Sequence, residues 1–144
     1  MPPRKREIDI KGLEAVKRNL ESLKSKSVAE TRRGLYVSAE LIMTQSKKIV
    51  PVDTGALRST GHVKPPVDTP GRIEIELGYG GPAGKGDKAG KDLGYGIWVH
   101  ERMDAQHKVG EAKFLQKPFE IAAPGVAAAL GESLRKLVES YHGA

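Results

Sequence analysis

The sequence contains no cysteine, few aromatic residues and no long apolar run. The absence of cysteine excludes a disulfide framework, a thiol nucleophile and any cysteine-ligated zinc or iron–sulfur site. No apolar run approaches the roughly 18 residues that span a bilayer, and the basic residues 1–6 are not followed by the apolar core of a signal peptide. We therefore expect a soluble, unexported chain that folds by packing alone.

The chain is basic, with a net charge of +6 and a pI near 9.5 over 144 residues. Clustered bases gain affinity for nucleic acid by releasing counterions from phosphate, which keeps a small basic nucleic-acid-binding protein open as an alternative function. Most bases, however, are interleaved with acids at helical spacing, as where Glu14 precedes Lys17 and Arg18. That arrangement is typical of a solvated helix face and weakens the nucleic-acid interpretation.

Apolar residues at helical spacing predict two consecutive helices in the first third of the chain. The first helix carries the stripe Leu13, Val16, Leu20 and Leu23. Residues 22–27 interrupt the pattern, and Ser27 with Glu30 matches a capping box, so a second and longer helix is expected to begin at Ser27. Pro51 should end that helix by excluding Val50 from the α region.

Alternating apolar residues predict three strands, at residues 59–64, 72–79 and 95–100. Residues 65–71 are too many and too rich in proline for a two-residue hairpin turn, so a wider loop is expected to join the first two strands. Residues 80–94 are rich in glycine and charge and almost free of apolar side chains. Such a segment cannot offset its ordering entropy by burial, which predicts a mobile loop that gains contacts only on docking.

A closing helix is expected at the C-terminus, with Pro118 in its first turn and a kink at Pro124 and Gly125. Its apolar face comprises Phe119, Ala122, Val126, Leu130, Leu134, Leu137 and Tyr141. Together the elements predict a single α+β domain over residues 1–144, with a flexible basic tip at residues 1–10. A small antiparallel sheet of three or four strands packs against a long N-terminal helix and a C-terminal helix, and its open edges are available to neighbours.

No motif predicts a catalytic residue, a metal site or a cofactor. The glycine–lysine pairs at residues 84–85 and 90–91 lack the flanking residues of a phosphate-binding P-loop. His100 and His107 are seven residues apart, whereas a metalloprotease helix needs histidines four apart. We expect His100 and Glu101 to form a structural or interfacial pair, and a small hydrolase that uses them with His107 is the enzymatic rival.

Several residues remain candidates for contacts with neighbouring molecules. Asp53 fits a turn-forming residue better than a catalytic carboxylate. Two interpretations of Arg58 stay open: a plain exposed strand residue, or a residue that contacts phosphate or a partner carboxylate. Trp98 is expected to pack in the core or against a neighbouring subunit. The candidate interface residues are Asp53, Thr54, Arg58, Lys85, Asp87, Lys88, Lys91, Trp98, His100 and Glu101. The expected structural anchors are Pro51, Gly55, Leu57, Tyr95, Phe114, Leu115 and Pro118, of which Phe114 and Leu115 should fix the closing helix to the sheet.

Three segments, taken in order, carry a resemblance to a known family. They are residues 50–58 (Val-Pro-Val-Asp-Thr-Gly-Ala-Leu-Arg), residues 95–101 (Tyr-Gly-Ile-Trp-Val-His-Glu) and residues 110–118 (Gly-Glu-Ala-Lys-Phe-Leu-Gln-Lys-Pro). They resemble the tail-completion, or head-tail joining, family of long-tailed bacteriophages, which also includes proteins called minor capsid proteins. The likeness runs from about residue 27 to the C-terminus, apart from the loop at residues 80–94.

The resemblance implies a structural virion protein without enzymatic activity. Such a protein forms a ring of six copies at the neck, between the head connector or stopper and the tail tube or tail terminator. The phage DNA passes through the ring without sequence-specific recognition, no membrane is involved, and before assembly the chain resides in the host cytoplasm. In such a ring the charged residues of the loop at 80–94 would lie at a subunit boundary or beside the DNA.

Overall fold

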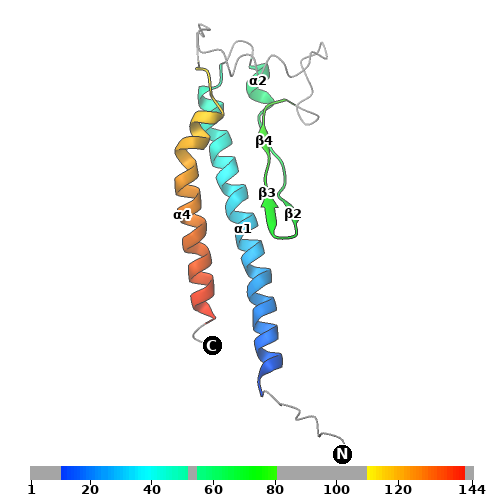
Figure 1. Cartoon of the computed structure of the whole chain (residues 1–144). Helices are drawn as coiled ribbons and strands as arrows, with labels where there is room; N and C mark the ends of the chain where they lie inside the picture. Colours follow the sequence, from blue (N-terminus) through cyan, green and yellow to red (C-terminus); the bar gives the residue numbers. More distant parts are fainter. Residues whose placement is uncertain (1–10, 52–54, 81–109, 142–144) are drawn as a thin grey trace, which may run out of the picture.

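The computed structural model describes residues 11–51, 55–80 and 110–141. Its elements are α1 (Leu13–Ile49), α2 (Ala56–Ser59), β1 (His62–Val63), β2 (Val67–Thr69), β3 (Arg72–Glu74), β4 (Leu77–Gly78) and α4 (Gln116–Ser140). In Figure 1, α1 is a central rod, with α4 along one side and the strands along the other. This arrangement confirms a mixed helix and sheet fold with a long N-terminal helix and a C-terminal helix.

The predicted break within the N-terminal helical region is wrong, because α1 runs without interruption for 37 residues. Ser27 does not cap a new helix, since its hydroxyl donates to the backbone carbonyl of Leu23 at 2.7 Å, one turn earlier. Serine can make such a bond inside a helix. Residues 22–27 contain neither glycine nor proline, so nothing in them forces the helix to stop. The resulting rod is about 55 Å long at 1.5 Å per residue.

The end of α1 agrees with the prediction made from Pro51. The helix stops at Ile49, and Val50 takes an extended conformation with φ −60° and ψ 134°. A residue before proline is excluded from the α region by contact with the proline ring. Gly55, with φ of +74°, then leads into α2, a single short turn that the sequence analysis assigned in part to a strand.

The sheet differs from the prediction, since it consists of two antiparallel pairs, β1 with β4 and β2 with β3. The expected wide loop at residues 65–71 is absent, because Val67–Thr69 is itself a strand. A two-residue turn at Pro70 and Gly71 joins it to β3. Proline fixes φ near −65° and Gly71 has a φ of +76°, the combination favoured at the centre of a type II turn.

The two strand pairs belong to one long hairpin with a one-residue offset between them. Val63 pairs with Leu77, whereas Val67 pairs with Glu74. Pro65 and Pro66 therefore oppose the single residue Ile75, which is the arrangement of a β-bulge. A bulge tolerates proline because its residues need not donate to the ladder, and this accounts for the division of the predicted strand 72–79 into two parts.

Helix α4 begins at Gln116, which places Pro118 inside its first turn, as predicted. Proline is tolerated there because first-turn amides have no partner within the helix. Pro124, the position of the predicted kink, lies inside this helix. The helix lies antiparallel to α1, since Ser22 near the start of α1 bonds Tyr141 at the end of α4, with 2.8 Å between their hydroxyl oxygens.

The best-buried cluster lies at the junction where α1 ends and α4 begins. Val50 and Phe114 are 0% and 2% exposed, and Ile49, Leu57, Tyr79 and Leu115 pack around them. The rings of Tyr79 and Phe114 meet edge to face, with centroids 5.2 Å apart. Burial raises the pKa of the Tyr79 phenol, while its hydrogen bond with the buried Ser46 hydroxyl, at 2.8 Å, acts in the opposite direction.

We predict that Phe114→Ala lowers the free energy of unfolding by about 3–5 kcal/mol, because it leaves a cavity in this cluster. Phe119→Ala provides the matched control, since Phe119 is 51% exposed on α4 and its loss should cost about 1 kcal/mol or less. Chemical denaturation of both variants measures the difference. Equal losses for the two would show that the junction is not the centre of the core.

Gly34 lies in the contact between α1 and α4, because a Cβ atom there would lie 2.5 Å from Cδ2 of Leu130. We predict that Gly34→Leu lowers stability, because overpacking between the helices costs about 1–3 kcal/mol and exceeds the gain of about 0.5–1 kcal/mol in helix propensity. Gly131→Leu on α4 is the control, since its Cβ would meet nothing within 4 Å and the change should stabilise the helix by about 0.5–1 kcal/mol. Thermal unfolding compares them, and the same sign for both variants would contradict the packing argument.

Candidate interaction surface

Most of the predicted interface residues lie outside the described residues. These are Asp53, Thr54, Lys85, Asp87, Lys88, Lys91, Trp98, His100 and Glu101, together with the predicted anchor Tyr95 and the predicted third strand at residues 95–100. Arg58 is described, and it is exposed on α2. Its positive charge acts on Tyr79 and offsets a small part of the rise that burial causes in the pKa of that phenol, so Arg58 lies beside the junction cluster.

The remaining predicted anchors gather around the junction. Pro51, Phe114 and Pro118 are buried, and Leu57 and Leu115 are half-buried against Val50 and Phe114. Gly55 supplies the left-handed residue before α2. The first and third segments of the family resemblance thus meet in one cluster, with Phe114 against the end of α1 and Tyr79 rather than on the face of a sheet.

Within residues 11–51, 55–80 and 110–141, no three histidine, cysteine, aspartate or glutamate side chains come together as metal ligands. The helices in this part of the chain are also too polar or too short to cross a membrane. What this part of the chain does present is apolar surface on α1 that other described elements leave open. Besides the exposed side chains of Val37 and Leu41, it occurs in two places.

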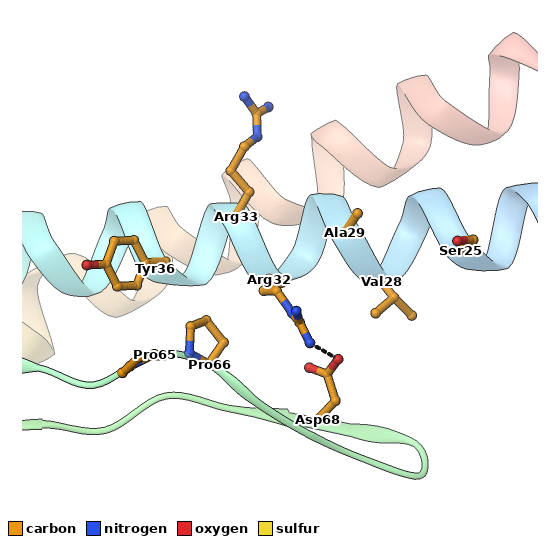
Figure 2. A pocket seen from close by; sticks show the side chains of 9 residues that line it. All are labelled: Ser25, Val28, Ala29, Arg32, Arg33, Tyr36, Pro65, Pro66 and Asp68. Atoms are coloured by element: carbon orange, nitrogen blue, oxygen red, sulfur yellow. Dashed lines mark hydrogen bonds and ion pairs between the residues drawn. The ribbon is translucent and has the colours of Figure 1, made fainter.

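The first is a cleft between α1 and the β2–β3 hairpin, here called the hairpin cleft, with a volume of about 570 Å³. Figure 2 shows α1 as one wall and the hairpin strands as the other, with Val28 and Tyr36 on the helix and Pro65 and Pro66 opposite. The complete lining is Ser25, Val28, Ala29, Arg32, Arg33, Tyr36, Pro65, Pro66 and Asp68. Its walls are mainly apolar, as is usual for clefts that accept another molecule.

One ion pair bridges the hairpin cleft. The guanidinium of Arg32 on α1 donates to the carboxylate of Asp68 on β2, as the dashed line in Figure 2 marks. Arg33, the next residue, pairs instead with Glu30 of its own helix at 2.9 Å. Tyr36 donates its phenol hydrogen to Glu40, and that bond to a carboxylate raises the pKa of Tyr36.

The second apolar surface is at the start of α1, and we call it the N-terminal stripe: Leu13, Val16 and Leu20. These side chains are 45%, 53% and 60% exposed. Helix α4 ends beside Ser22 and Lys26, where Tyr141 bonds the first and lies 5.4 Å from the ammonium of the second. In Figure 1, α1 extends past the end of α4, so this stripe lies beyond the two-helix contact.

The sequence analysis assigned these apolar residues to helix faces but did not identify either surface. The hairpin cleft depends on strand β2, which was taken for a loop. The N-terminal stripe becomes an overhang only because α1 is continuous and has 12 more residues than α4, 37 against 25. The absence of a helix breaker at residues 22–27 was the available signal.

Comparison with models of protein families, with curated proteins and with solved structures gave no match to this chain.

We predict that Arg32→Ala speeds amide hydrogen exchange in β2 and β3 while changing global stability by about 1 kcal/mol or less. An exposed ion pair contributes little to the total free energy of unfolding. A two-stranded ribbon is only marginally stable by itself, so loss of the pair should still increase local opening of the hairpin. Arg33→Ala is the control, because its partner is on α1, and hairpin exchange should be unchanged. Equal exchange in both variants would show that the Asp68 contact does not hold the hairpin.

Proposed function

We propose that this chain is an assembly subunit that acts by docking, of the head-tail joining kind found in long-tailed bacteriophages. The observation that carries the proposal is the exposed apolar surface of α1, at the N-terminal stripe and in the hairpin cleft. Large apolar side chains gathered on an exposed surface mark sites of contact with other molecules. Two separate surfaces of this type suit a subunit that contacts more than one neighbour.

The identification with the neck of a phage rests on the three sequence segments of the resemblance. Support for treating two of them as one unit comes from the junction, where Val50 and Leu57 of the first segment pack with Phe114 and Leu115 of the third. A ring of copies between the head connector and the tail tube is the arrangement that the resemblance implies. The proposal assigns the chain no catalytic step and no cofactor.

The charges of the described helices and strands favour docking over the nucleic-acid alternative. Several bases on α1, on α4 and on the hairpin form ion pairs with neighbouring carboxylates: Lys17, Arg32, Arg33, Lys64, Arg72, Lys117, Arg135 and Lys136. Pairing of this kind reduces the positive potential that draws a protein to phosphate. Passage of DNA through a ring requires no sequence recognition.

The proposal is tested by removing the gene for this chain from the phage that encodes it. We expect filled heads and complete tails to accumulate unjoined, and the purified chain to restore joining when added to that lysate. Electron microscopy counts joined particles and locates the chain at the neck. Joined, infectious particles at normal frequency without the chain would refute the proposal. Duplex DNA binding with a steep salt dependence, together with absence from particles, would favour the nucleic-acid alternative.

A further inference from the structure

The N-terminal stripe and the hairpin cleft complement one another in shape and chemistry. The stripe is a convex row of apolar side chains on a bare helix, and the cleft is a concave, mainly apolar space between α1 and the hairpin. Both lie on α1, so one copy cannot bring its own stripe into its own cleft while the helix stays straight. Val16 and Arg32 are 16 residues apart, which is about 24 Å along a helix.

We propose that the N-terminal stripe of one copy docks in the hairpin cleft of a second copy. The proposal deepens the assembly function above and rests on it in one respect, that copies of the chain associate with each other. Each copy then offers a helix to one neighbour and a cleft to the other. Such a head-to-tail contact is heterologous, and it closes into a ring when the rotation between copies permits.

The fit follows from spacing and volume. Leu13, Val16 and Leu20 occupy positions i, i+3 and i+7, the anchor pattern of an amphipathic helix that enters an apolar groove. The cleft volume of about 570 Å³ lies within the range of roughly 300–1,000 Å³ that holds ligand groups. Val28 on α1 and Pro66 across from it would receive the anchors, because they stand on opposite walls.

A symmetric pairing of two N-terminal stripes is less favourable than this contact. In a two-fold interface each surface meets itself. Two stripes packed against each other would leave both hairpin clefts open, whereas the contact of a stripe with a cleft covers both surfaces.

The area of the contact indicates why a second copy, in a closed ring, is the fitting occupant. Three half-exposed aliphatic side chains offer at most a few hundred Å² of apolar surface. A stable two-body interface needs about 800 Å² per partner. A single stripe-in-cleft contact is therefore weak, and it becomes effective when a ring makes each further contact intramolecular.

The absence of cysteine from the chain permits a direct test by disulfide trapping. Full-length Val16→Cys and Ala29→Cys variants, of different mass, are mixed at high concentration and oxidised with oxidised glutathione. We expect a mixed disulfide at least tenfold more abundant than that from Val16→Cys with Ile121→Cys. Ile121 is the control position because it is 82% exposed on α4, away from both surfaces.

A non-covalent measurement accompanies the trapping. Leu20→Asp should weaken self-association at least tenfold in sedimentation while leaving the melting temperature unchanged, since Leu20 is 60% exposed. Ile121→Asp should change neither the self-association nor the melting temperature.

Predominant Val16–Val16 disulfides would overturn the proposal in favour of symmetric pairing. A chain that remains monomeric and gives no mixed disulfide would overturn it outright. If the chain is found at the neck but the mixed disulfide does not form, the stripe-in-cleft contact is wrong and the proposed function stands. If the mixed disulfide forms but the chain is absent from particles, the contact stands and the proposed function is wrong.

Discussion

The packing of Phe114 against Val50 fixes the relation between two helices that are far apart in sequence. Beside it, the amide of Glu111 donates to the carbonyl of Ile49 at 2.9 Å, which satisfies one of the acceptors left open at the end of a helix. The chain crosses at Gly110, where a Cβ atom would lie 2.6 Å from the Ile49 carbonyl oxygen. Only glycine permits that approach, so the direction in which α4 departs depends on this junction.

The junction also determines which part of α1 stays uncovered. Because both helices meet at one end and α4 is shorter, its last residues can reach α1 no further than the contact of Tyr141 with Ser22 and Lys26. The apolar periodicity of α1 nevertheless continues to Leu13. Within the described part of the chain these apolar side chains stay exposed to water, which is the basis of the docking proposed for this surface.

Sequence reasoning predicted the structure correctly where one residue type has a single strong effect on the backbone. It failed where contacts with neighbouring elements determine the local structure. Pro51 ends α1 because of its ring, and Phe114, a large apolar side chain in a polar stretch, is buried because that removes its ring from water. The capping pattern at Ser27 was misleading, since serine has an alternative bond inside a helix that is already stabilised by α4. The hairpin was missed because a bulge at Pro65 and Pro66 hides the alternation on which strand prediction depends.

The separation between the junction and the two apolar surfaces bears on the docking that we propose. The core cluster lies at one end of the molecule, whereas the hairpin cleft and the N-terminal stripe lie along α1 toward the other end. The far part of the hairpin is bridged to α1 by the exposed Arg32–Asp68 pair, a contact that contributes little to global stability. A helix entering the cleft could therefore shift the hairpin without disturbing the core. Docking and folding would then depend on different residues, and a partner could adjust one surface at little cost to the fold.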